Sequence, residues 1–329
     1  MKKVMILMWF VFIQTGYSQE HETLKVAFWN VENLFDLIDN PDKNDDEFAI
    51  GGKKDCSESI LNLKLDHLSE VLTEMNADIF GLCEVENRKV LEWLNDRYSE
   101  RNYSIIHYES PDNRGIDNML YYDPERFTVL NARPITIVFD DGKPTRDILY
   151  VQGKFGKEIL HIYVNHWPSN YGGKEQAIPR RAETARVLRK DINRILQENP
   201  LAEIVLMGDF NEDPTETAVK DILYSTMDVN ASAGQLVNLM GPFFGKPEVG
   251  TYVWRGDDYF LDQIIVSTGL MDGIGISVQS GSMAIHDKPK YRQQSGKYAH
   301  YPFRFWAGNK LLGGYSDHLA VSVVLSLAK

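Results

Sequence analysis

Short apolar runs alternate with a few amphipathic segments along most of the chain. Runs rich in β-branched and aromatic residues, bounded by turn formers, are typical of strands. This pattern predicts strands over 24–31, 78–84, 104–108, 117–122, 127–138, 147–154, 158–165, 203–208, 262–267, 274–279 and 319–327. Apolar residues recur every three or four positions over 59–75 and 177–198, which predicts two helices. Shorter helices are expected after Asn87 and after Pro214, because proline suits a first helical turn.

The first residues of the chain have the sequence features of a signal peptide. Lys2 and Lys3 precede the apolar run Val4–Ile13, and Gly16 and Ser18 place small residues before a plausible cut. The run is too short to span a bilayer, and no cysteine follows it to carry a lipid anchor. We therefore expect residues 1–18 to be removed after Ser18, and the protein to be secreted or periplasmic.

No linker rich in Pro, Gly or Ser divides residues 19–329. Strands and helices in this order favour a single α/β domain with mixed sheets over two separable domains. The polar and mostly acidic stretch 36–55 is interpreted as a solvated surface loop, because its spacing does not match an EF-hand.

Composition narrows the classes of function. With 43% hydrophobic and 25% charged residues the chain is globular, and 2 cysteines exclude a disulfide scaffold and a four-cysteine zinc module. Whether Cys56 and Cys83 pair is left open, although Cys83 lies in an apolar run typical of a buried thiol. The net charge of −12 argues against nonspecific electrostatic binding to nucleic acid or to an anionic membrane. A phosphate-handling enzyme stays open if cations gather at one cleft or a metal ion supplies the charge.

Polar residues able to bind a metal or a phosphate stand at the ends of several predicted strands. The segments are Phe28–Asn33, Leu82–Asn87, Val164–Ser169, Met207–Asn211, Leu261–Ile265 and Ser316–His318.

Each of these residues also has a plain structural interpretation. Glu84 could form a structural salt bridge, and Asp209 with Asn211 could form an Asx-turn before Pro214. His166 alone is more typical of a satisfied structural histidine than of a catalyst. The occurrence of all the segments in one chain, in this order, favours a shared site.

In that order the chain resembles the endonuclease/exonuclease/phosphatase superfamily, which contains DNase I-like nucleases, abasic-site endonucleases, sphingomyelinases and inositol-polyphosphate phosphatases. The resemblance spans Val26–Val324 and is strongest to secreted bacterial members, through the motifs at 114–117, 166–169, 172–173 and 314–318. It implies a four-layer α/β/β/α sandwich of two mixed sheets, with the site at the sheet edges on one side.

The resemblance implies roles for the acidic and amide residues. Asn30 and Glu84 are similar to the first metal-site pair of the family, and Asp317 to a further acid of that site. Glu32 stands where some nucleases of the family have a second acid, so Glu32 and Asp209 are candidate ligands of a second metal ion.

The remaining site residues are implied in the same way. Asn211, with Asp209, resembles the acid and amide that position the attacking water and the phosphate. His318 is similar to the catalytic histidine and Asp262 to its orienting carboxylate. His166 resembles the second histidine of the DNase I-like branch, and Arg114 a phosphate contact.

This assignment agrees with phosphodiester chemistry. A hard divalent cation on carboxylate and amide oxygens neutralises developing charge, so Mg²⁺ is the expected cofactor, with Mn²⁺ as a substitute. An attacking water needs a proton acceptor, and whether Asp209 or His318 is that acceptor stays open.

We expect a metal-dependent phosphodiesterase, in first place a nuclease acting on DNA or RNA. Cations alternate with aromatic residues over 286–310, directly before Asp317 and His318, which suits phosphates and unstacked bases. Arg180 and Arg181 could add to the rim of the cleft, and Tyr252 and Trp254 to its wall.

Two alternatives keep the fold. One is a sphingomyelinase-like or other small-phosphoester hydrolase, for which Gly241–Gly245 is the sole short apolar candidate for a lipid-entering hairpin. The other is an inactive binding protein on the same scaffold. No membrane anchor and no protein partner is inferred.

Overall fold

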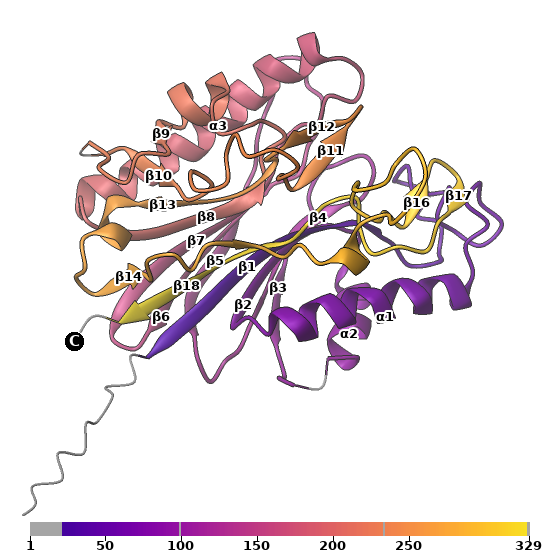
Figure 1. The fold of residues 1–329 in the computed structure, drawn as a ribbon, viewed down its shortest axis with the longest axis horizontal. Helices are drawn as coiled ribbons and strands as arrows, with labels where there is room; N and C mark the ends of the chain where they lie inside the picture. Colours follow the sequence, from indigo (N-terminus) through magenta and orange to yellow (C-terminus); the bar gives the residue numbers. More distant parts are fainter. Residues whose placement is uncertain (1–21, 99, 233, 328–329) are drawn as a thin grey trace, which may run out of the picture.

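Two mixed β-sheets lie face to face in the structure, a computed structural model that describes residues 22–98, 100–232 and 234–327 (Figure 1). The predicted leader, residues 1–18, lies outside this part of the chain. The first sheet has the order β14-β18-β1-β2-β4-β3, with β15 beside β18. Its strands are β1 (Thr23–Leu34), β2 (Ile79–Val85), β3 (Ser104–His107), β4 (Asp117–Tyr122), β14 (Ile276–Val278), β15 (Ala284–Ile285) and β18 (Val321–Leu327).

The second sheet has the order β5-β6-β7-β8-β13-β10-β9. Its strands are β5 (Thr128–Ile135), β6 (Ile148–Phe155), β7 (Glu158–His166), β8 (Glu203–Asp209), β9 (Ser225–Thr226), β10 (Leu236–Asn238) and β13 (Asp262–Ser267). Two short hairpins stand apart from both sheets, β11 (Tyr252–Trp254) with β12 (Asp257–Tyr259), and β16 (Trp306–Ala307) with β17 (Lys310–Leu311).

Helices form the two outer layers. Figure 1 shows α1 (Glu58–Met75) and α2 (Arg88–Asp96) below the first sheet, and α3 (Lys174–Glu198) above the second. The Ser57 hydroxyl accepts a hydrogen bond from the Ile60 N–H at the start of α1, and the Asn87 side chain caps α2 through the Val90 N–H. Pro179 lies inside α3, past its first turn, where it removes one helical N–H donor. The predicted four-layer sandwich is therefore confirmed.

Alternation along each strand decides which layer its side chains enter. In β1, Leu24, Val26 and Phe28 pack between the two sheets, whereas Ala27 and Trp29 pack against the helices. The strands β7, β8 and β13 alternate in the same way between the inter-sheet core and the core beneath α3. Each sheet is thus buried on both faces, which explains why its central strands are apolar almost throughout.

The predicted strands and helices are all present, with boundaries that shift by a few residues. The segment after Pro214 forms a short π-helical turn, η1 (Ala218–Ile222). The strands that the pattern misses, among them β9, β11, β16 and β17, have two or three residues and are too short for any periodicity to show.

Two further expectations concern the cysteines and the membrane. Cys56 and Cys83 are both buried free thiols, as the apolar surroundings of Cys83 predict. Among the described residues, no helix combines the length and apolar character that crossing a bilayer requires.

The topology brings distant strand ends together. β1 and β2 run parallel to each other, as do β7 and β8, while β13 and β18 run antiparallel to their neighbours. As a result, the segments that follow β1, β2, β7 and β8 meet the segments that precede β13 and β18 at one edge of the two sheets.

Candidate active site

Four of the predicted site residues lie on strands, each two positions from a residue of the inter-sheet core. Each therefore faces the same way as that core residue. Asn30 follows Phe28 on β1, His166 follows Val164 on β7, and Asp209 follows Met207 on β8. Asp262 precedes Ile264 on β13 in the same register, opposite Asp209. Because side chains two apart share a face, these four polar groups cap one end of the apolar core, and each is less than 5% exposed.

Glu84 reaches the same place by a different route. Phe80 and Leu82 on β2 face the helices, so strict alternation would send Glu84 there too. A β-bulge between Cys83 and Val85, with Glu84 at φ 63°, turns the side chain toward the site. One Glu84 oxygen accepts a hydrogen bond from the Asn33 N–H (3.0 Å), and the other lies 3.8 Å from His166 Nε2.

Several residues at this site have a left-handed backbone conformation. Glu32 (φ 53°), Asn33 (φ 58°) and Asn211 (φ 51°) join Glu84 in a conformation that side-chain-bearing residues seldom adopt. Such residues cost free energy and persist where the surroundings fix them, typically at functional sites. The strain therefore marks the same strand ends that the polar residues mark.

Asp209 lies at the centre of the cluster. Its Oδ2 accepts a hydrogen bond from Asn30 Nδ2 (3.0 Å) and lies 3.8 Å from the Nε2 atoms of both His166 and His318. Its Oδ1 accepts from the Asn211 N–H (2.9 Å), the Asx-turn expected here. Asn211 Nδ2 donates to the Trp167 carbonyl (3.0 Å), which ties the turn to the end of β7.

His318 is paired with Asp262, as the resemblance implies. The distance from His318 Nδ1 to Asp262 Oδ2 is 2.7 Å, and the Asp262 N–H donates to the Thr251 hydroxyl. Burial alone would lower the pKa of His318, but Asp262 and then Asp209 raise it well above its ordinary value. The ring of Tyr252 lies 4.7 Å from the imidazole, so Tyr252 does form a wall of the site. Trp254, at the end of the same strand, is 52% exposed.

His166 has the opposite electrostatic environment. Burial, and then the cations Arg146 and Arg114, lower the pKa of His166 well below its ordinary value. Its Nδ1 is buried and has no hydrogen-bond partner among the described residues, while Nε2 faces Glu84 and Asp209. Environment alone thus shifts the pKa values of the two imidazoles in opposite directions.

Asp317 and Glu32 form the far side of the site. Arg304 Nη2 donates to Asp317 Oδ2, and Asp317 Oδ1 lies 4.0 Å from His318 Nε2. The two Glu32 oxygens accept hydrogen bonds from the Phe305 N–H (2.6 Å) and the Trp306 N–H (2.8 Å). Glu32 is therefore engaged by the start of β16 and the residue before it, lies 3.9 Å from Arg304 Nε, and has no contact with Asp209 in the described part of the chain.

Two arginines stand near Glu84 and His166. Arg114 is a half-exposed predicted residue whose Nη2 lies 3.6 Å from Glu84 Oε1. Sequence reasoning misses Arg146, a buried residue whose guanidinium donates to the Trp167 carbonyl (2.8 Å) and pairs with Asp112. Arg146 lies just before β6, where a lone arginine carries no signal.

The basic and aromatic segment 286–310 is largely occupied by internal contacts. Lys288 and Lys290 pair with Glu70 and Glu74 of α1, and Arg292 pairs with Asp287. Tyr291 and Phe305 are buried. Arg181 is likewise buried against Glu212, and Arg180 pairs with Asp141. These residues fix the loops around the site, and most of them present no free surface to a ligand.

The donors present fit a hard divalent cation. Glu84, Asp209 and Asp317 offer carboxylate oxygens, and Asn30 offers an amide oxygen. Asp209, Asp262 and His318 also place one atom each within 4.8 Å of one another. Burial raises the pKa of Asp209 to about 6, and His318, which lowers this pKa, offsets the burial only in part. A cation at these oxygens would add to the positive charge that His318 provides.

The architecture and this site together define the DNase I-like class. Residues 25–327 match the sequence model of the Endonuclease/Exonuclease/phosphatase family, and the chain belongs to that family. No curated protein matches the chain.

Solved structures similar to the chain support the fold. A humanized zebrafish (D. rerio) TDP2 is 16% identical with a TM-score of 0.59, covering 93% of this chain and 99% of its own. The human Nocturnin catalytic domain with bound sulfate is 18% identical with a TM-score of 0.57, covering 93% and 95%. A mannosyl-6-phosphatase of Bacteroides thetaiotaomicron is 16% identical with a TM-score of 0.58, covering 92% and 100%.

Proposed function

We propose that the protein is an exported, divalent-metal-dependent phosphodiesterase that hydrolyses DNA or RNA by in-line attack of water. The observation that carries the proposal is the convergence of Glu84, Asp209, His166 and His318 within a few ångströms, from strands far apart in sequence. Family membership supports phosphoester chemistry at this edge of the sheets.

The two histidines and the central aspartate divide the proton chemistry. Asp262 and Asp209 raise the pKa of His318, so we assign it to stabilise or protonate an oxygen of the phosphoryl group. Asp209, ionised above its pKa of about 6, is then the acceptor for the proton of the attacking water. His166 stays neutral and can donate one hydrogen bond from Nε2 to a phosphate oxygen.

Glu84, Asp317 and Asn30 would hold Mg²⁺, or Mn²⁺ in its place. The bound cation would neutralise charge that develops on the phosphoryl oxygens. Arg114, half-exposed beside Glu84, is placed to contact a neighbouring phosphate of the substrate.

Nucleic acid is the first candidate substrate because a zebrafish TDP2 of the same fold is described in complex with a single-stranded DNA product. A small phosphoester is the second, because most cations of the segment 286–310 are paired internally. A lipid substrate has less support, since Phe243 and Phe244 of the candidate hairpin pack against the core.

A substrate panel tests the proposal. The purified protein is offered plasmid DNA, single-stranded DNA, RNA, sphingomyelin, a sugar phosphate and a small aryl phosphodiester, with EDTA or with Mg²⁺. We expect cleavage of a polynucleotide that EDTA stops and Mg²⁺ or Mn²⁺ restores. Cleavage of a sugar phosphate or lipid alone, or hydrolysis that persists in EDTA, would refute it.

Variants connect any activity to the site. Glu84→Gln, Asp209→Asn and His318→Ala should each lower turnover by about 10²-fold or more with little change in thermal stability. Glu92→Gln, an exposed carboxylate on α2, is the matched control and should leave turnover unchanged. The assignment fails if two of the three site variants turn over at the wild-type rate. Export is checked separately by N-terminal sequencing of the secreted protein, which should begin at Gln19.

A further inference from the structure

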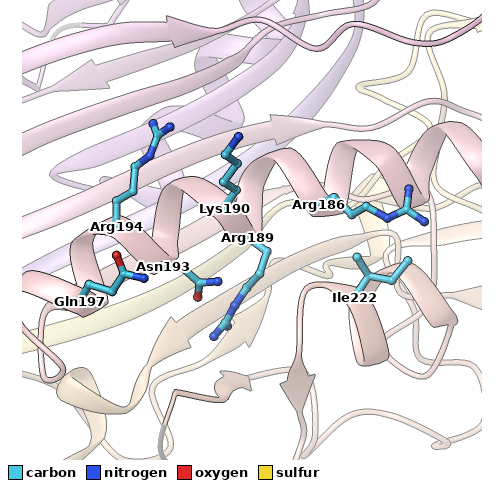
Figure 2. Close-up of a pocket in the computed structure, with 7 residues that line it drawn as sticks. All are labelled: Arg186, Arg189, Lys190, Asn193, Arg194, Gln197 and Ile222. Carbon is cyan, nitrogen blue, oxygen red and sulfur yellow. The ribbon is translucent and has the colours of Figure 1, made fainter.

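A basic groove runs along the outer side of α3, away from the candidate active site. It has a volume of about 440 Å³ and no acidic residue in its lining. We call it the α3 groove, and Figure 2 shows its lining residues, Arg186, Arg189, Lys190, Asn193, Arg194, Gln197 and, from η1, Ile222. Four cations without an acid are unusual in a chain of net charge −12.

Most of this positive charge is free to act on a ligand. Lys190 is exposed and forms no ion pair in the described ranges. Arg186 pairs with Glu183 at the surface (2.8 Å), a contact worth little in water. Arg194 lies 3.6 Å from Asp191, a buried acid that Arg133 and the Tyr163 hydroxyl already engage.

Arg189 gives the groove a fixed floor. The Arg189 guanidinium donates hydrogen bonds to the carbonyls of Leu223 and Gly234, in segments beside α3. Burial lowers the pKa of Arg189. Figure 2 shows Arg189 and Asn193 projecting from one side of α3, and Lys190 and Arg194 from the other. A side chain held in this way is organised before a ligand arrives.

The spacing of the exposed cations suits a chain of phosphates. Arg186, Lys190 and Arg194 recur every fourth residue, which gives a rise of about 6 Å per step along the helix. That interval is comparable with the separation of successive phosphates in a single strand. The amides of Asn193 and Gln197 add hydrogen-bond donors that suit phosphate or sugar oxygens.

We propose that the α3 groove binds the phosphodiester backbone of single-stranded nucleic acid, as an accessory site outside the catalytic cluster. This inference rests on the proposed function in taking the ligand to be the substrate's own strand. The groove lies beyond Arg181, which anchors the Pro168 carbonyl beside the site, by about 8–24 Å of helix rise. A strand in the groove would therefore hold nucleotides several positions away from the cleaved bond. Ile222 is the single apolar residue of the lining, which favours a phosphate chain over a membrane surface.

Binding is measured without hydrolysis. Fluorescence anisotropy of a labelled 20-nucleotide single-stranded DNA is followed in EDTA at several salt concentrations. The test variant is R186Q/K190Q/R194Q, and the control is K154Q/K157Q/K246Q, which removes the same charge from exposed lysines elsewhere. We expect the test variant to bind at least 10-fold more weakly and with a shallower salt dependence, while the control changes affinity less than 2-fold.

The comparison of the two variants and two further readouts, vesicle binding and hydrolysis, separate the remaining outcomes. Equal weakening in the two variants would show a general charge effect and overturn the proposal, as would unchanged binding in the test variant. Loss of binding to phosphatidylglycerol vesicles, with DNA binding retained, would overturn it in favour of a membrane. Hydrolysis of the small aryl phosphodiester should be the same in the test variant and the wild type. If the wild type hydrolyses no phosphodiester, the proposed function fails, yet the anisotropy result still decides whether the groove binds a strand.

Discussion

At the scale of single residues, environment separates side chains of identical chemistry. His166 and His318 both lie within 3.8 Å of the same Asp209 oxygen, yet their pKa values move in opposite directions. Asp262 accounts for much of the difference, because it pairs with His318, while Arg146 and Arg114 act on His166. Because both residues are histidines, their type does not tell the two pKa shifts apart. The sequence alone could therefore name both histidines but could not divide their roles.

Glu32 shows how the surroundings decide between two roles for one carboxylate. If Glu32 holds this segment through its two hydrogen bonds, Glu32→Gln leaves one of the Phe305 and Trp306 N–H groups without an acceptor. The substitution should then lower the free energy of unfolding by about 1–3 kcal/mol at pH 8. The number of Mn²⁺ ions bound, measured by calorimetry, should stay unchanged.

Glu84→Gln is the matched comparison for Glu32→Gln. We expect the reverse pattern for it, weaker Mn²⁺ binding with little loss of stability. A reduced Mn²⁺ stoichiometry in Glu32→Gln, with full stability, would instead make Glu32 a ligand of a second metal ion.

At the scale of strands and helices, apolar runs and their polar ends predict where the elements lie and where the site residues stand, and alternation decides which way the side chains face. Strand-end positions and the resemblance name Asn30, His166, Asp209 and Asp262, and in the structure the alternation turns all four toward the inter-sheet core. The alternation fails for Glu84, because the β-bulge reverses the facing and a bulge of one residue leaves no mark in the pattern. It also misses the pairing of Lys290 with Glu70 and Glu74, which lie more than 200 positions away.

Gly208 tests how closely β7 and β8 must approach. A Cβ on Gly208 would lie 2.5 Å from both the Cβ and the carbonyl oxygen of Asn165, which backbone movement alone could relieve. Gly208→Ala should therefore cost about 1–3 kcal/mol and displace the neighbouring Asp209, with a loss of turnover.

Gly81→Ala is the control for Gly208→Ala. Its Cβ would meet the flexible end of Met207 and a Val164 methyl group, so its cost should be smaller. Urea unfolding of both variants measures the difference, and equal stabilities would show that the strand spacing is adaptable.

At the scale of the whole molecule, acids are distributed unevenly between surface and interior. Three apolar cores separate the four layers, and several carboxyl groups are buried at their margins. Burial raises the pKa of Glu86 to about 8 and that of Glu203 to about 7. The folded protein therefore binds protons that the unfolded chain would release near neutral pH.

The titration of Glu203 makes the stability of the protein depend on pH in a direction that can be measured. Its folded pKa of about 7 exceeds the ordinary value of 4.5, so the folded state holds the extra proton between these values and stability falls as pH rises through them. Glu203→Gln keeps an acceptor for the Ile276 N–H and removes the titration. Thermal unfolding from pH 4.5 to pH 8 should show a flatter decline in the variant.

Glu125→Gln, which changes an exposed carboxylate, is the control for this series. An identical pH profile in Glu203→Gln and the wild type would mean that Glu203 titrates normally in the folded state.

The close approach of β1 and β18 has a consequence for biosynthesis. The Trp29 indole donates to the His318 carbonyl across 289 positions, and Asn30 reaches Asp209 across 179. A nascent polypeptide therefore carries no competent centre until translation has passed His318 and the ribosome has released that stretch. Fragments from premature termination or early proteolysis would lack His318 and so could not assemble the complete cluster.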